Sequence, residues 1–291
     1  MKAFKSANQA YQQQDYKKAT TLYEEAITAN PDLNQAYFFL ANSLDQQYKP
    51  ARKGEEANDA LLAKAVDYYQ QAADRLGASE NPEDKKIGKL ALEYLVAAYG
   101  ADKLNDPAKA EPVVQKMIQL EPGEPSNYFA LAKIYEDAGA YAEAEQMLQY
   151  AKAARPNDPA VYMQLAGYYN RQADFDKTID ALTQRASVEP NNPEAFFTIS
   201  TYYWDNAQRN PLLSDDEKRS QVEKGLEAVD RALQIKGDYM EALVYKGLLL
   251  RTQANLEKDA AKQQALLKEA NALKDQAEEI KKKRTAGAAG N

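Results

Sequence analysis

The sequence predicts an all-α protein made of helical hairpins that stack on one another. The chain repeats itself with a period of 34 residues, and Tyr128, Tyr162 and Phe196 share this spacing. Within each half of the unit, apolar residues lie three and four positions apart, which is typical of one buried helix face. Proline-containing turns follow the units, as at Pro156 and Pro190. Two helices per period form one hairpin, and a tandem array of hairpins is a solenoid.

Other positions keep the same period and show which residue types the packing needs. The first helices repeat an aliphatic residue, a small residue and a tyrosine: Leu131, Leu165 and Ile199; Ala132, Ala166 and Ser200; Tyr135, Tyr169 and Tyr203. The second helices place small residues such as Ala144 and Ala151 three or four positions from Leu148. Small side chains let two helix backbones approach closely, and a larger one would overpack the contact at a cost of about 1–3 kcal/mol.

Composition excludes most catalytic chemistry. The chain has 291 residues, a formal net charge of −7, and neither histidine nor cysteine. Imidazole acid–base catalysis, thiol nucleophiles, disulfides and nearly every zinc or haem site are therefore excluded. Pairs of acidic residues such as Glu24 and Glu25 are typical of solvated helix faces. We expect no enzyme, no cofactor and no metal site, and the negative charge disfavours nucleic acid as a partner.

These residues resemble the tetratricopeptide repeat (TPR) family, and the resemblance covers essentially the whole chain. The family pattern sets a large residue, Leu, a small residue and Tyr in the first helix, then Ala, an aromatic or Leu, Ala and Pro in the second. The resemblance implies a right-handed α–α superhelix of about seven hairpins, closed by a long C-terminal capping helix. We expect one solenoid over residues 1–284 and a disordered tail over residues 285–291. The approximate repeats are 1–33, 34–78, 82–122, 125–156, 159–190, 193–237 and 239–284.

Turn residues predict where individual helices begin. Asp158 and Asn192 each precede a proline, so each can cap the next helix with Pro159 or Pro193 as its first residue. Ser214 is followed three residues later by a glutamate, which is the spacing of a capping box.

Two units carry about a dozen extra residues at the same place, near 48–60 and 207–219. Each insertion contains a proline, Pro50 or Pro211, ahead of residues with a helical pattern. We expect a proline elbow followed by a second helix lengthened by three turns. This extension is either added stacking area or a docking surface or dimer contact.

Two further segments depart from the repeat pattern. Thr178 and Arg185 replace small residues in the second helix of the fifth unit. A buried arginine is costly unless it is paired or reaches solvent, so this hairpin is expected to be tilted or looser. The segment from Asp259 to about Lys283 predicts a long amphipathic helix that caps the array, with contact to a partner helix as the alternative.

The resemblance implies a concave groove lined by the first helix of each hairpin, chiefly at its fifth, ninth and twelfth positions. Apolar residues flanked by amides suit a peptide, so we expect a protein or peptide partner. The alternative is that these side chains pack against neighbouring helices. The candidate groove residues are Phe38, Asn42, Phe129, Lys133, Met163, Asn170, Phe197, Thr201 and Trp204.

One specific activity of the family is not expected. Chaperone-binding members hold a C-terminal carboxylate with Lys, Asn and Arg at fixed positions of three consecutive units. At those positions this chain offers Lys5, Gln9, Phe39, Leu90 and Tyr94. The carboxylate clamp is therefore absent, which disfavours an adapter for chaperone C-termini.

The expected function is a non-enzymatic protein–protein interaction scaffold that binds a peptide or protein segment in the groove. The alternative is a self-assembling structural module, a homo-oligomer held by convex surfaces or by the extended helices. The compartment stays open: no stretch reaches the roughly 20 apolar residues of a membrane span, and residues 1–6 lack a secretory apolar region. A soluble cytoplasmic protein and a bacterial periplasmic or exported protein with its signal removed both fit.

Overall fold

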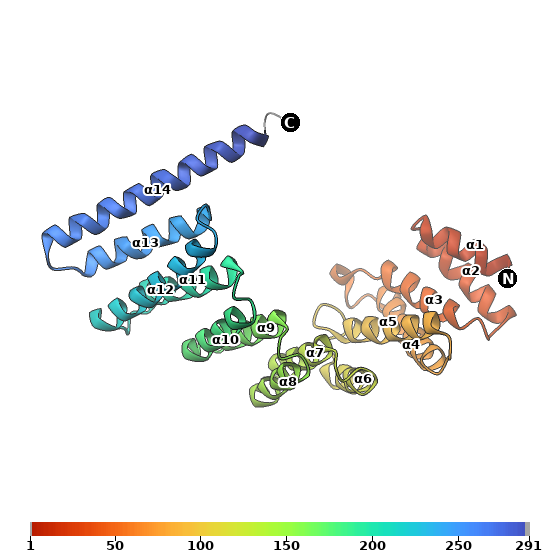
Figure 1. Cartoon of the computed structure of the whole chain (residues 1–291). Helices are drawn as coiled ribbons and strands as arrows, with labels where there is room; N and C mark the ends of the chain where they lie inside the picture. Colours follow the sequence, from red (N-terminus) through yellow and green to blue (C-terminus); the bar gives the residue numbers. More distant parts are fainter. Residues whose placement is uncertain (1, 289–291) are drawn as a thin grey trace. The chain divides into compact units, whose positions relative to one another are not determined.

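The computed structural model describes residues 2–288, which fold into helices without a strand (Figure 1). The helices form consecutive pairs in which the two members pack on each other. This arrangement confirms the predicted all-α array of helical hairpins. The helices are α1 (Lys2–Gln12), α2 (Tyr16–Ala29), α3 (Asn34–Gln47), the short 3-10 helix η1 (Pro50–Arg52), α4 (Glu56–Gly77), α5 (Pro82–Tyr99), α6 (Pro107–Leu120), α7 (Pro125–Asp137), α8 (Tyr141–Ala154), α9 (Pro159–Arg171), α10 (Phe175–Val188), α11 (Pro193–Arg209), α12 (Asp215–Ile235), α13 (Met240–Leu256) and α14 (Ala260–Ala288).

Polar caps and prolines begin the helices where the sequence predicts them. The side chains of Asp158 and Asn192 each accept a hydrogen bond from the backbone N–H two residues later, at 2.9 and 3.0 Å. Pro159 and Pro193 are the first residues of α9 and α11. The missing N–H of proline costs nothing at this position, because the first helical N–H groups have no partner inside the helix. Both predicted caps are confirmed.

The two second helices after the insertions are longer, as expected, but by about two turns rather than the expected three. Helices α4 and α12 have 22 and 21 residues, whereas the corresponding α8 has 14. Helix η1 precedes α4, and residues 210–214 form the elbow between α11 and α12. Ser214 and Glu217 form the predicted capping box: the Glu217 carboxylate accepts from the Ser214 backbone N–H at 2.7 Å, and the Ser214 hydroxyl accepts from the Glu217 N–H at 3.3 Å.

The chain divides into two compact units after Arg155. Unit 1 contains α1 to α8, and unit 2 contains α9 to α14. Helix α14 has 29 residues and continues to Ala288. Residues 285–288, expected to belong to a disordered tail, are thus helical, whereas residues 289–291 of that tail lie outside the described residues.

Unit 1 depends on close contact between helices at small residues. The buried core includes Ala7, Ala19, Ala41, Ala65, Ala72 and Ala91, with Tyr23 and Tyr69 between them. One close crossing lies between α4 and α5. A Cβ atom added to Gly88 would stand 2.8 Å from the backbone nitrogen of Gly77 and 3.1 Å from the carbonyl carbon of Leu76. The two helices therefore touch backbone to backbone.

A buried chain of hydrogen bonds joins the first three hairpins. The Tyr11 hydroxyl donates to the Asn42 Oδ1 at 2.7 Å, and the Asn42 Nδ2 donates to the Tyr69 hydroxyl at 3.2 Å. The Tyr69 hydroxyl also lies 3.4 Å from the Asp45 Oδ2. Lys103, from the loop between α5 and α6, reaches back to the Asp45 Oδ1 at 2.5 Å. Burial, and then the negative charge of Asp45, raise the pKa of Tyr69, so this hydroxyl stays neutral.

Unit 2 also has close helix contacts at glycines. A Cβ on Gly225 of α12 would stand 2.8 Å from the Leu249 Cδ2 and 3.2 Å from the Tyr203 Cβ. A Cβ on Gly247 of α13 would meet the backbone of Ala270 in α14 at 3.3 Å. Small residues therefore mark the helix contacts in both units.

Arg185 is buried, and its charge is paired. Its Nε lies 2.9 Å from Glu189, its Nη2 lies 3.6 Å from Glu194 at the start of α11, and its Nη1 lies 3.1 Å from the Met163 sulfur of α9. Thr178 is also buried and donates its hydroxyl hydrogen bond to the backbone oxygen of Asp174 at 2.7 Å. These partners explain how both polar residues fit into positions that the pattern reserves for small side chains.

We predict that Gly88→Ala destabilises unit 1 by about 1–3 kcal/mol, because the new methyl group overlaps backbone that cannot move aside without separating α4 from α5. The matched control is Gly167→Ala in α9, where the added carbon meets only the end of the flexible Arg171 side chain. The control should be neutral or stabilising, since alanine favours helices by about 1 kcal/mol over glycine. Urea unfolding followed by far-UV circular dichroism measures both; equal effects would contradict the backbone contact.

A second prediction concerns the Asp45–Lys103 ion pair. Lys103→Met should lower the free energy of unfolding by about 1–3 kcal/mol, because it leaves a carboxylate of which only 5% is exposed without its cation. Adding Asp45→Asn removes the orphaned charge and should restore part of the loss. A double-mutant cycle in urea gives the coupling between the two residues. Purely additive losses would show that the pair contributes nothing.

Candidate binding surfaces

The described residues contain no group of three or more acidic side chains placed to hold a metal ion. No helix among those residues is long and apolar enough to span a membrane. Two surfaces among the described residues stand out as candidate binding surfaces, one in each unit.

The structure places Phe38 and Asn42 inside unit 1. Phe38 is 4% exposed and packs against the rings of Tyr69 and Tyr94, with ring centroids 5.9 and 5.8 Å apart. Asn42 is 2% exposed, because both ends of its amide are used by Tyr11 and Tyr69. These two candidates form part of the core, where neighbouring aromatic rings cover them.

Phe129 and Lys133 lie on α7, also in unit 1. Phe129 is half-buried. Lys133 is exposed and pairs with Asp137 one turn later on the same helix. Their burial leaves both side chains accessible from solvent.

The remaining candidates lie in unit 2. On α9, Asn170 is exposed, and Met163 is 38% exposed although its sulfur contacts Arg185. On α11, Phe197, Thr201 and Trp204 are all half-buried. Unit 2 thus holds five of the nine candidates, all on first helices of hairpins, and none of them is fully buried.

Phe197 and Trp204 belong to a row of four aromatic rings that we call the aromatic row: Tyr239, Phe197, Tyr245 and Trp204. Phe197 lies 5.2 Å from both tyrosine rings, and Trp204 lies 5.5 Å from Tyr245, edge to face. All four rings are half-buried. Val244, next to Tyr245, is 42% exposed. The row therefore joins α11 to α13 and still presents ring surface and an aliphatic side chain to solvent.

Sequence reasoning did not select the two tyrosines of the row. Tyr239 is the N-cap residue of α13, and Tyr245 follows the fifth position of its repeat rather than occupying it. The signal that could have found Tyr245 is its neighbour Val244, which stands at the same repeat position as Phe197. Burial, and then the charges of Glu194 and Glu241, raise the pKa of Tyr239, so its hydroxyl stays protonated.

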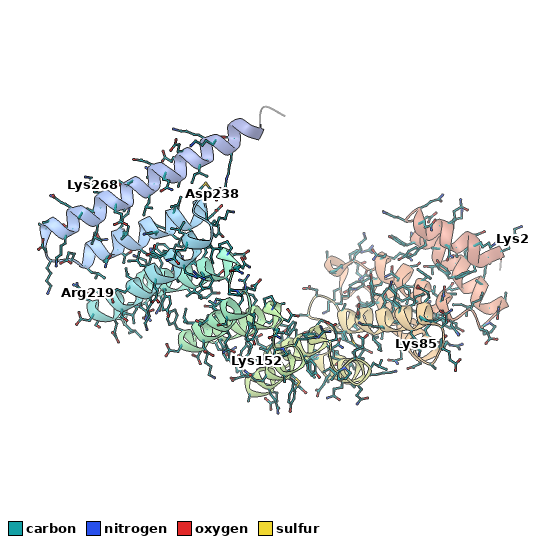
Figure 2. All side chains as sticks on the ribbon, viewed as in Figure 1. Lys2, Lys85, Lys152, Arg219, Asp238 and Lys268 are labelled. Carbon is teal, nitrogen blue, oxygen red and sulfur yellow. The ribbon has the colours of Figure 1, made fainter. Side chains whose placement is uncertain are left out.

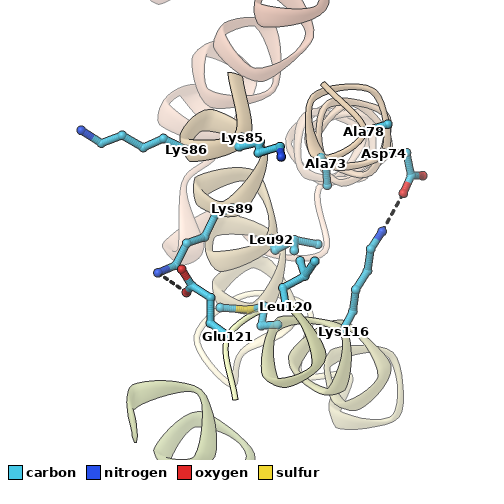
Figure 3. A pocket seen from close by; sticks show the side chains of 13 residues that line it. Ala73, Asp74, Ala78, Lys85, Lys86, Lys89, Leu92, Lys116, Leu120 and Glu121 are labelled. Carbon is cyan, nitrogen blue, oxygen red and sulfur yellow. Dashed lines mark hydrogen bonds and ion pairs between the residues drawn. The ribbon is translucent and has the colours of Figure 1, made fainter. Parts of the chain in front are cut away.

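The second surface is a cleft of about 730 Å³ in unit 1, between the ends of α4 and α6 and the first half of α5 (Figure 3). We call it the lysine cleft. Its apolar lining includes the buried Leu92 and Met117 and the 60% exposed Leu120. The charged residues around it are Lys85, Lys86, Lys89, Lys116, Asp74 and Glu121.

Two of the lysines hold ion pairs across the cleft rim. Lys89 lies 2.5 Å from Glu121, and Lys116 lies 2.9 Å from Asp74 (Figure 3). The hydrogen bond to Glu121 raises the pKa of Lys89. Burial opposes ionisation of Asp74, but hydrogen bonds from Gln70 and Lys116 outweigh it and lower the pKa of that carboxyl. Lys89 is therefore protonated and Asp74 ionised at neutral pH.

The other two lysines are exposed and have no carboxylate within ion-pair distance among the described residues. Lys85 points over the cleft, and Lys86 points away from it (Figure 3); Figure 2 places Lys85 on α5 in unit 1. The cleft carries four cations against two anions, on a chain whose net charge is −7. Sequence reasoning missed it because it assigned no role to Lys85, Lys86 and Lys89, and only the fold brings α6 beside them.

Comparison with known proteins supports the repeat assignment. Residues 103–167 match the sequence model of the tetratricopeptide repeat. No curated protein matches the chain. Among solved structures, the C-terminal part of a TPR repeat-containing protein from Cytophaga hutchinsonii is 16% identical with a TM-score of 0.57, over 95% of this chain and 98% of that one.

Two further structures are similar at lower scores. A tetratricopeptide repeat protein from Parabacteroides merdae is 15% identical with a TM-score of 0.48, over 92% of this chain and 97% of its own. The MamA crystal structure is 18% identical with a TM-score of 0.42, over 72% of this chain and 99% of its own. At these identities, the Cytophaga protein shows the fold alone. Residues 103–167 therefore carry the tetratricopeptide repeat signature, and the chain shares the fold of a solved TPR repeat-containing protein.

Proposed function

We propose that this protein is an interaction scaffold that binds a peptide or protein segment on the first-helix face of unit 2. The tetratricopeptide fold is the fold of protein–protein interaction scaffolds, which supports the general class. The aromatic row supports the location: it presents ring surface, and aromatic residues are enriched where proteins bind each other.

The chemistry of the row fits an extended or helical segment with apolar side chains. Val244 and Met163 are exposed apolar side chains that also lie on first helices of hairpins. Thr201, between Phe197 and Trp204 on α11, adds a half-buried hydroxyl whose own hydrogen is donated to the Thr198 carbonyl at 2.7 Å. The rings already pack against one another, so little side-chain freedom is lost when a partner binds. The other candidate groove residues, Phe129 and Lys133 in unit 1 and Asn170 on α9, remain accessible to the same kind of partner.

The proposal is tested by selecting peptides from a random display library on the purified chain and measuring their affinity for variants. Thr201→Glu with Val244→Glu places two carboxylates beside the row without removing a ring, so selected peptides should bind at least about tenfold more weakly. The matched control is Ala265→Glu on an exposed face of α14, which should leave binding unchanged. Peptides that bind the double variant as well as the unaltered chain would place their site elsewhere, and far-UV circular dichroism checks that both variants remain helical.

A further inference from the structure

The elbow between α11 and α12 presents an apolar side chain of unusual exposure. Leu212 is 89% exposed, more than any other large apolar residue for which exposure is marked among the described residues. Hydrogen bonds on both sides of Leu212 hold the backbone of the elbow in place. The Asn210 Oδ1 accepts a hydrogen bond from the Leu212 backbone N–H at 3.1 Å, and the capping box of Ser214 and Glu217 begins α12 two residues later. The elbow is therefore held in a defined turn before any partner binds.

Carboxylates follow directly after this leucine. Asp215 and Asp216 are both exposed in the first turn of α12, and the side chain of Asp216 is fully exposed. The nearest cation to Asp216 is Arg219, whose Nε lies 3.9 Å away (Figure 2 labels Arg219 on α12). Glu217 is occupied by the capping box. The elbow and the first turn of α12 together thus offer one leucine and two available negative charges within five residues.

The lysine cleft of unit 1 offers the complementary features. Leu120 is 60% exposed beside the buried Leu92 and Met117, so the cleft has an apolar floor that no described side chain covers fully. Lys85 stands over this floor with no carboxylate partner, and Lys116 stands on the opposite side (Figure 3). The positive charges are spread along two helices rather than gathered at one point, which suits a chain segment with separated carboxylates more than a single anionic headgroup.

We propose that the elbow of one copy of this protein docks in the lysine cleft of a second copy. Leu212 lies on the floor formed by Leu92, Met117 and Leu120, and Asp215 and Asp216 face Lys85 and Lys116. The contact joins two different surfaces. It gives either a two-fold dimer, in which the contact is made twice, or a head-to-tail chain of copies. It is separate from the peptide-binding face of unit 2 and does not depend on it.

Such a contact is small and strongly electrostatic. An elbow of about six residues buries much less than the area of a stable interface, so the association is weak and reversible. Because the charges are exposed, salt screens them, and the association should weaken when the ionic strength is raised from about 0.05 to 0.5 M.

Charge reversal tests the proposal with the full-length chain. The cleft variant is Lys85→Glu with Lys116→Glu, and the elbow variant is Asp215→Lys with Asp216→Lys. Sedimentation velocity over a wide concentration range should show self-association of the unaltered chain and at least a tenfold weaker association constant for each variant alone. An equimolar mixture of the two variants should regain association, because each copy then meets a complementary partner. A misfolded variant could not produce this recovery.

Two further variants sharpen the test. Lys17→Glu with Lys18→Glu changes the net charge of the chain by the same amount on the exposed face of α2, and association should remain as in the unaltered chain. Leu212→Ser changes no charge and should weaken association at least tenfold. The proposal is overturned if the unaltered chain is monomeric at all concentrations at low salt, if the mixture does not recover, or if cross-links between Asp216 and Lys85 form only within one copy.

Discussion

The structure depends on how closely two helix backbones can approach. At Gly88 and Gly225 there is no room for a single methyl group without displacing a neighbour. At other small positions, Ala41, Ala132 and Ala166, the side chain is a single methyl group. Small residues at these places let helices within each unit pack closely, so the 34-residue period is also a period of close helix contacts. The tyrosines and leucines between these contacts fill the space that the close approaches leave.

The aromatic residues decide which first-helix positions remain available to a partner. In unit 1, Phe38 is covered by Tyr69 and Tyr94, and Asn42 is used by the hydrogen-bond chain that ends at Lys103. The same repeat positions in unit 2 hold Phe197 and Thr201, which are only half-buried. The positions are equivalent in the repeat, but their neighbouring side chains differ. The unit 1 residues are therefore part of the core, whereas the unit 2 residues remain at the surface.

Much of the fold could be predicted from the sequence because its determinants are local. The caps at Asp158, Asn192 and Ser214 involve residues two or three positions apart, and a helix period is visible within one turn. The lysine cleft could not be predicted, since Lys85 on α5 comes to line the same cleft as Leu120 and Lys116 of α6 only when the chain has folded. The burial of Asn42 likewise depends on Tyr11 and Tyr69, which are 31 and 27 residues away. Arg185 combines a predictable and an unpredictable feature. Its burial followed from its repeat position, whereas its partner Glu194 belongs to the next hairpin and could not be identified from local sequence.

The position of Trp204 has a spectroscopic consequence. It is the only tryptophan of the chain, it stands in unit 2, and its ring meets Tyr245 edge to face. The fluorescence of this indole therefore reports on α11 and its contact with α13, both in unit 2. Unfolding of α1 to α8 that leaves α9 to α14 folded would not change the tryptophan fluorescence. A method that reports on the whole backbone would be needed to detect it.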